Sequence, residues 1–159
     1  MSKVCARSAS HSLHGGAKFI LVVALAGIAG CTKTTTRETA MTFREMHLAA
    51  IAKMEKGMSG EAASRAFLGR STKVEAIAGE AMRGICTVCY EMIDGDIKFI
   101  ALPHPDLDPL KFGIFVERNR GQKVHIIGIV AAGPNYLAGS TRGTLVPAPL
   151  AIKVLEIGL

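Results

Sequence analysis

The feature that most constrains this sequence is an uninterrupted apolar run near its start. Residues 19–30 read FILVVALAGIAG and include no polar side chain. A helix needs about 20 apolar residues to cross a membrane, so this run is too short to span one. Three basic residues precede the run, and no acidic residue occurs before Glu38. This layout is typical of a secretory signal peptide, so we exclude residues 1–30 from the fold prediction.

The end of the run resembles the lipobox of bacterial lipoproteins. Ile28, Ala29 and Gly30 precede Cys31, which matches the aliphatic residue, two small residues and cysteine of that motif. The resemblance implies cleavage before Cys31, diacylglycerol on its thiol and a further acyl chain, such as palmitate, on its new amine. Two or three acyl chains hold a protein stably on a membrane. The alternatives are an uncleaved anchor and an ordinary signal peptide with a chance cysteine.

The composition of the mature chain fits one small domain behind a tether. Thr32 follows the cysteine, and the absence of Asp there resembles lipoproteins of the outer membrane, so we expect a lipid-anchored protein facing the periplasm. Residues 31–41 are polar and aperiodic, which predicts a flexible tether. Residues 42–159 are then one domain, with residues 131–159 as an extension whose role is open. Removing the signal peptide lowers the net charge from +6 to +3, and the chain has no Trp, so we expect no nucleic-acid partner.

Two helices at the start of the domain are marked by their capping residues. Thr42 and Glu45 have the spacing of a capping box, and apolar residues then recur at three- and four-residue intervals until Gly57 ends the helix. Ser59 begins a second, shorter helix that ends at Gly69. The sequence therefore predicts a helical hairpin.

The remainder of the domain is predicted to consist of strands and turns. Proline confines one segment to a rigid loop, and Asn-Arg-Gly favours a hairpin turn. We therefore expect an α+β fold in which a two-helix hairpin packs on a small antiparallel β-sheet. The predicted strands are 81–92, 97–102, 112–117, 123–130 and 151–157, with turns at 93–96 and 119–121 and the rigid loop at 103–109.

The helical hairpin resembles the SmpA/OmlA, or BamE-like, family of outer-membrane assembly lipoproteins. In that family a helix ends at Gly, a capped short helix follows, and a Leu-Gly pair closes it before a three-stranded antiparallel sheet. Ser71 stands where the family usually has Pro. The resemblance implies a non-catalytic accessory or scaffold without a cofactor, acting in envelope or outer-membrane β-barrel assembly with a barrel-assembly component as its partner. The matching residues are Gly57, Met58, Ser59, Glu61, Leu68, Gly69 and Thr72.

Cys86 and Cys89 are the strongest competing signal. A C-x-x-C pair in an exported protein acts as a redox dithiol when its first thiolate lies at a helix N-terminus. The surrounding residues favour an extended chain, which would place the two Cα atoms roughly 10 Å apart, beyond the roughly 7 Å limit for a disulfide. A turn would instead permit a structural disulfide. Unpaired thiols, a disulfide, a redox pair and metal ligands all stay open, and the alternative function is a membrane-tethered thiol redox protein.

Other candidate sites are weaker. His104 and His125 could join the two cysteines around a metal, but they lack the tight pairing of zinc ligands, so we expect no metal site. His47 lies on the apolar side of the first helix and is predicted to pack in the core. No hydrolase motif or phosphate-binding loop occurs, so we expect no catalytic residues. The acidic residues Asp94, Asp96, Asp106 and Asp108 are predicted to be solvated turn residues, not a calcium site.

Overall fold

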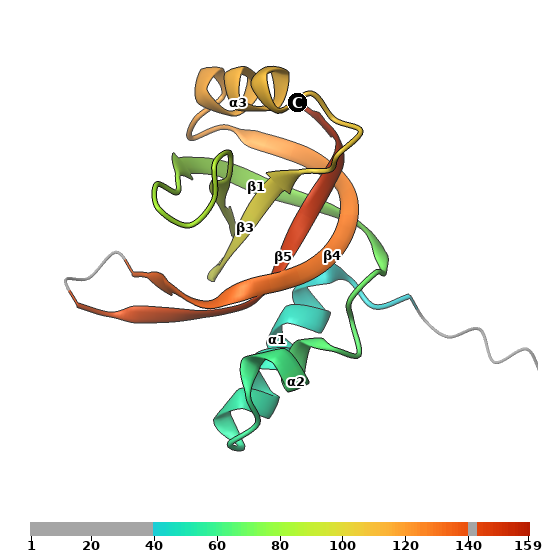
Figure 1. Ribbon diagram of the computed structural model, residues 1–159, viewed down its shortest axis with the longest axis vertical. Helices are drawn as coiled ribbons and strands as arrows, with labels where there is room; N and C mark the ends of the chain where they lie inside the picture. Colours follow the sequence, from blue (N-terminus) through green and yellow to red (C-terminus); the bar gives the residue numbers. More distant parts are fainter. Residues whose placement is uncertain (1–39, 140–142) are drawn as a thin grey trace, which may run out of the picture. The chain divides into compact units, whose positions relative to one another are not determined.

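A computed structural model describes residues 40–139 and 143–159 (Figure 1). The predicted signal peptide, Cys31 and the tether up to residue 39 lie outside these residues. None of the helices in the described part has the length and apolarity that a membrane crossing requires. The elements are α1 (Phe43–Glu55), α2 (Gly60–Ser64), β1 (Ser71–Ala81), β2 (Tyr90–Asp94), β3 (Ile97–Pro103), α3 (Pro109–Arg118), β4 (Lys123–Ala138) and β5 (Leu145–Gly158).

The five strands close into a barrel in the order β1-β2-β3-β5-β4. β1 pairs antiparallel with both β2 and β4, which closes the barrel, while β3 and β5 run parallel with Ile100 opposite Ala151. Since α3 connects β3 to β4, this is the topology of the OB-fold, a five-stranded Greek-key barrel. The predicted α+β fold, a two-helix hairpin on a small antiparallel sheet, is therefore wrong.

The barrel interior is set by the two-residue period of its strands. Thr72, Val74, Ala76 and Ala78 of β1 are buried, and the residues between them are exposed. An alternation of this kind directs every second side chain into a barrel. Large apolar side chains from the other strands fill the interior, and the largest of these that are fully buried are Met92, Phe99, Ile126, Leu150 and Ile152.

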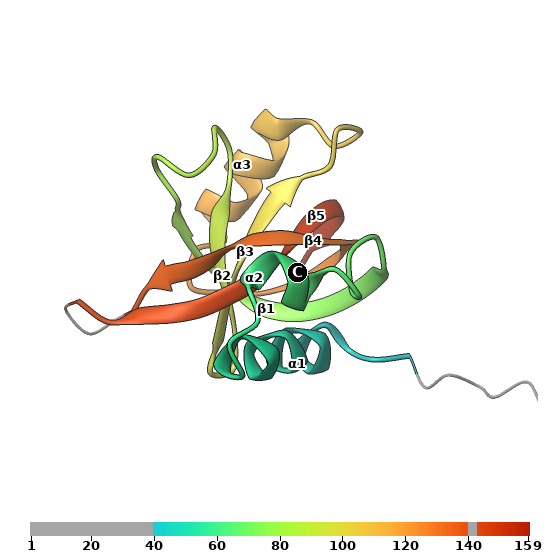
Figure 2. The same cartoon turned by 60° about the horizontal axis from the view of Figure 1, so that its bottom comes forward.

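Helices cover the two ends of the barrel (Figures 1 and 2). At one end Phe43 of α1 packs on Phe99 of β3, with ring centroids 4.7 Å apart. At the other end Phe112 of α3 meets Tyr90 of β2 edge-to-face at 5.7 Å. α1, α3 and the barrel thus share one apolar core.

The predicted helical hairpin is present, with the predicted caps at both ends of α1 and at the start of α2. The second helix ends at Ser64, before the predicted end at Gly69, because residues 65–69 form turns. The Thr42 hydroxyl accepts from the Glu45 amide, and the Glu45 carboxylate accepts from the Thr42 amide in return. Gly57 takes a positive φ of 87° just beyond α1, and the Ser59 hydroxyl accepts from an amide in the first turn of α2. Local capping chemistry therefore determined these two helices, although they cover a barrel instead of a small sheet.

The strand predicted at 112–117 is wrong, because this segment is α3. The Asp108 carboxylate caps the helix by accepting from the Leu110 and Lys111 amides, and Pro109 occupies its first turn. The predicted turn at 119–121 consequently ends a helix and joins no hairpin. Proline in the first turn needs no amide partner, so the end of the predicted rigid loop is a helix start.

Two further strand predictions need correction. Most of the segment 81–92 is a loop, residues 82–89, and the first strand is β1, which precedes it. In the segment 131–159, residues 131–138 and 145–158 belong to the sheet, because β4 and β5 pair from His125–Gly158 as far as Ala138–Leu145. Beyond the barrel this pair continues as a two-stranded extension, residues 133–138 and 145–149, which we call the arm (Figure 1).

Candidate functional site

An apolar groove lies between the loop 82–89 and the base of the arm. Its volume is about 260 Å³. The floor comes from the outer faces of β3 and β5, one wall from the loop and the other from β4. We call it the apolar groove, and its lining residues are Ile85, Cys86, Ile100, Leu102, Ala132, Gly133, Pro134 and Ala151.

The local sequence explains why this outer surface is apolar. Ile100 and Leu102 point outward from β3 but remain largely covered, and Ala151 lies beside Ile100 in the parallel pair. A strand that is apolar on both faces is typical of a position covered on both sides. A second apolar cluster therefore forms outside the barrel, containing Cys89, Ile100, Leu137, Ala148 and Ala151.

An irregularity in β4 forms the other wall of the groove. The β4–β5 register shifts between Ala132 and Asn135, and Asn135 adopts a positive φ of 70°. Gly133 at this bulge is packed so closely on the β5 backbone that a Cβ there would collide with the Ala148 carbonyl oxygen. Bulges of this kind bend a strand and increase its twist, which is how β4 changes from barrel strand to arm.

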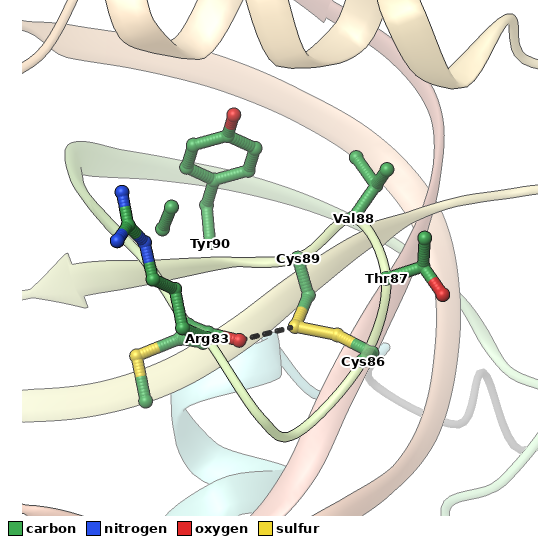
Figure 3. A pocket seen from close by; sticks show the side chains of 8 residues that line it. Arg83, Cys86, Thr87, Val88, Cys89 and Tyr90 are labelled. Carbon is green, nitrogen blue, oxygen red and sulfur yellow. Dashed lines mark hydrogen bonds between the residues drawn. A yellow bond between two sulfur atoms is a disulfide. The ribbon is translucent and has the colours of Figure 1, made fainter.

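The loop 82–89 contains a disulfide between Cys86 and Cys89 (Figure 3). The two Cα atoms are 5.9 Å apart, because the chain turns here and is not extended as the neighbouring residues suggested. Cys89 is only 3% exposed, while Cys86 is half-buried. The Cys89 Sγ lies 3.6 Å from the Met82 carbonyl oxygen. Of the alternatives left open by the sequence, the structure contains the disulfide.

A second concave surface borders the same loop, and we call it the α3 cleft. It has a volume of about 530 Å³ and is lined by Val88 and Tyr90 on one side and by α3 on the other. Leu110 of α3 is 72% exposed there, and Ile114 is 43% exposed. The disulfide loop thus separates two apolar concavities, one on each side.

The structure does not bring the proposed metal ligands together. Cys86 and Cys89 are bonded to each other in the disulfide. His104 lies beside Asp106, and the Nδ1 of His125 is 3.5 Å from a carboxylate oxygen of Glu75. Within residues 40–139 and 143–159 no three His, Cys, Asp or Glu residues are arranged to hold a metal ion.

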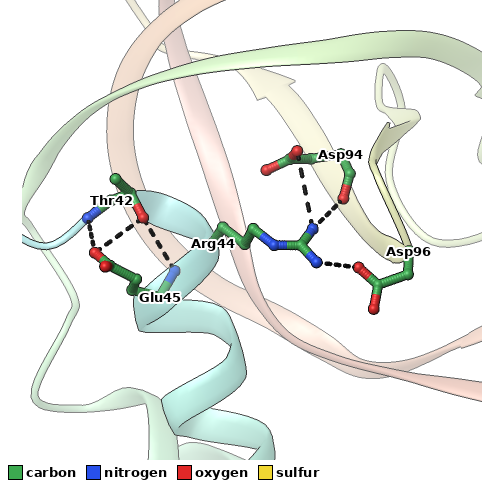
Figure 4. Close-up of polar contacts among 5 residues, drawn as sticks. All are labelled: Thr42, Arg44, Glu45, Asp94 and Asp96. Atoms are coloured by element: carbon green, nitrogen blue, oxygen red, sulfur yellow. Dashed lines mark hydrogen bonds and ion pairs between the residues drawn. The ribbon is translucent and has the colours of Figure 1, made fainter.

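Asp94 and Asp96 attach α1 to the β2–β3 turn (Figure 4). Arg44 donates to the Asp94 carbonyl oxygen at 2.7 Å and forms an ion pair with Asp96. The hydrogen bond from Arg44 lowers the pKa of Asp96. These acidic residues therefore have structural partners, and Asp108 caps α3.

His47 packs in the core, as the apolar pattern of α1 indicated. It is fully buried, its ring lies 5.6 Å from that of Phe43, and its Nε2 is 3.4 Å from the Pro147 carbonyl oxygen in the arm. Its Nδ1 has no hydrogen-bond partner among the described residues. Burial lowers the pKa of His47 to about 4, so the ring is neutral near pH 7.

No titratable side chain lines the apolar groove apart from the disulfide-bonded Cys86. General acid–base chemistry needs a His, carboxylate, Lys or similar group within hydrogen-bond reach of the substrate. The groove instead offers aliphatic surface and backbone, which is suited to binding an apolar group. Of the residues that line the groove, Cys86 was a predicted site residue and the others were not. The sequence signal for the floor of the groove is the nearly continuous apolar run of β3.

Comparison of the chain with known protein families and with curated proteins found no match. The strand topology and the apolar groove therefore define the class of this protein. It is a five-stranded barrel of OB topology with an apolar groove beside its β1–β2 loop. Barrels of this class bind oligonucleotides and oligosaccharides on the face of strands β2 and β3, between the β1–β2 and β4–β5 loops. The apolar groove shares the β1–β2 loop and β3 with that surface, but no residue of β2 lines it. The three-stranded sheet implied by the resemblance to the SmpA/OmlA family is not the observed one.

Proposed function

We propose that this chain is a membrane-anchored periplasmic lipoprotein that acts without catalysis, as an accessory or scaffold in the assembly of envelope or outer-membrane β-barrel proteins. Lipid on Cys31 holds it to the outer membrane, and the barrel binds an envelope protein. The observation that carries the proposal is the apolar groove, which lacks acid–base groups and lies between the β1–β2 loop and the outer faces of β3 and β5.

The residue types in the groove favour a protein partner over a nucleic acid. Single-stranded nucleic acids are bound by aromatic side chains for stacking and basic side chains for phosphates. The groove contains neither type. Aliphatic side chains with a bulged strand beside them suit an apolar segment of a polypeptide.

The lipid anchor is tested at Cys31. In Cys31→Ser we expect loss of acyl labelling and release of the protein from membranes, because the thiol that carries diacylglycerol is absent. Cys5 lies inside the predicted signal peptide, so Cys5→Ser is the matched control and should keep both properties. Membrane retention of Cys31→Ser would refute the anchor.

The partner is tested by affinity purification of the detergent-solubilised protein. We expect recovery of a β-barrel assembly component. We expect Ala132→Glu to reduce that recovery by about tenfold or more, because an apolar partner that covers the groove would remove water from the ionised carboxylate. Ala132 is exposed, so this change leaves the core intact. Ala138→Glu, on the same strand but outside the groove, is the control. Equal recovery with both variants would exclude the groove as the binding surface.

A thiol redox protein is the second candidate, favoured by the disulfide in an accessible loop. Its test is whether substoichiometric protein accelerates the reduction of a disulfide substrate by dithiothreitol. Cys86→Ser with Cys89→Ser is the control. The accessory role predicts no rate above this control, and a clear acceleration would favour the redox protein.

A further inference from the structure

We propose that the Cys86–Cys89 disulfide is a redox-controlled latch that holds the loop 82–89, and that it is opened by a dithiol reductant attacking Cys86. This goes beyond the proposed function and does not depend on the lipid anchor. Cys86 is then the site of thiol–disulfide exchange, and the structural consequence of the exchange is release of the loop 82–89.

The two cysteine residues differ in exposure, and we infer the site of attack from this difference. Cys89 is 3% exposed and belongs to the apolar cluster outside the barrel. Cys86 is half-buried and lines both the apolar groove and a smaller cavity of about 100 Å³ inside the loop. An incoming thiolate therefore reaches the Sγ of Cys86, and Cys89 is the leaving group. Figure 3 shows both sulfur atoms among the side chains that line the smaller cavity.

The reaction is an exchange that conserves electrons and protons. One thiolate of the reductant attacks the Sγ of Cys86, a mixed disulfide forms, and Cys89 leaves as a thiolate. The second thiolate of the reductant then attacks the reductant's first sulfur, which is bonded to Cys86 in the mixed disulfide, and Cys86 leaves as a thiolate. The reductant becomes a disulfide, two electrons pass to the protein, and the two protons of the dithiol end on Cys86 and Cys89.

Apart from the packing of Met82, Cys86 and Val88 on the two apolar clusters, few contacts fix the shape of the loop. Its base is closed by the Met82 amide, which donates to the Cys89 carbonyl oxygen at 2.9 Å. Within the described residues no other backbone hydrogen bond involves residues 83–88. Ile85 forms a wall of the apolar groove and Val88 a wall of the α3 cleft, so freeing the loop displaces a wall of each concavity.

Hydrogen exchange of two amides tests whether the latch acts locally. The protein, purified in detergent, is compared in the oxidised state and after reduction with dithiothreitol. We expect reduction to accelerate exchange of the Met82 amide by about tenfold or more and to leave the His104 amide unchanged. His104 is a suitable control because its amide donates to the Val154 carbonyl oxygen at 2.9 Å, beside the β3–β5 pair. Unchanged exchange at Met82, or equal acceleration at both amides, would overturn the latch.

Two single-cysteine variants test the site of attack. Cys89→Ser leaves only Cys86 in the loop, and Cys86→Ser leaves only Cys89. With glutathione disulfide as the probe, we expect Cys86 to form the mixed disulfide about tenfold faster than Cys89. Trypsin places both positions in the peptide 84–98, apart from Cys5 and Cys31, so mass spectrometry assigns the product. Equal rates, or faster reaction of Cys89, would refute the assignment.

The latch and the proposed function can fail separately. Both measurements are repeated on Cys31→Ser protein, and the latch predicts the same exchange rates with and without the lipid. Loss of the latch with intact acylation refutes only the latch. An intact latch without acylation refutes only the lipid anchor.

Discussion

Acidification should destabilise this protein through His47. The ring is fully buried, and the pKa of the folded state is about 4, against an ordinary value of about 6.5. The unfolded chain therefore binds one more proton between these pH values, and the free energy of unfolding falls as the pH falls. The contribution of the neutral ring to the free energy of unfolding is present above about pH 6.5 and is lost as the pH falls to about 4. The shift corresponds to about 3 kcal/mol over this window, of which about 2 kcal/mol is lost by pH 5.

The measurement is urea unfolding at a series of pH values between 7 and 4, followed by far-ultraviolet circular dichroism, since the chain has no Trp. His47→Gln keeps a polar side chain in place but removes the titration. The carboxylates titrate in both proteins, so the difference between the two pH profiles isolates His47. Parallel profiles for the wild type and His47→Gln would show that the ring does not control acid stability.

Three further changes probe the barrel and the loop. Gly128→Ala should destabilise the protein by more than about 1 kcal/mol, because a Cβ there would lie 2.5 Å from the Lys153 carbonyl oxygen. Gly158→Ala is the control and should be neutral, because a Cβ at that position meets open space. Urea unfolding measures the stability of both variants. Phe99→Ala should cost about 3–5 kcal/mol by the same assay, because this fully buried ring packs against α1. Cys86→Ser with Cys89→Ser should cost about 2 kcal/mol, the entropy of closing so short a loop, measured as a fall in the urea midpoint relative to the oxidised wild type.

The elements that sequence patterns predicted correctly are those with local determinants. Thr42 and Glu45 satisfy each other's backbone groups within a few residues, so their spacing alone identified the start of α1. β1 lacks such a signal, because Ala76 and Ala78 face the interior with small side chains of low strand propensity. α3 was hidden for a related reason: its aromatic and β-branched residues favour a strand, and only the Asp108 cap and Pro109 indicate a helix.

The candidate site was less predictable than the fold. Its floor joins β3 to β5, whose paired residues Ile100 and Ala151 are 51 positions apart in the sequence. Neither residue carries chemistry that a motif could reveal. The disulfide was equally ambiguous, since its formation depended on whether residues 86–89 lie in a strand or a turn. That choice is made by the positions of β1 and β2, not by the residues between the cysteines.

The same reasoning explains how a resemblance to a two-helix, three-stranded family could accompany a five-stranded barrel. The matching residues are mostly caps, and a Gly after a helix or a Ser before one satisfies backbone groups in any fold. Such residues mark the end of α1 and the start of α2 but say nothing about what the helices cover. That is decided by the buried face of α1, where Phe43 meets Phe99 of β3 and His47 meets the carbonyl oxygen of Pro147 in β5. Both partners follow later in the chain, so the capped hairpin could be identified without its sheet. The barrel that it covers is determined by long-range strand pairing, of β3 with β5 and of β1 with β4.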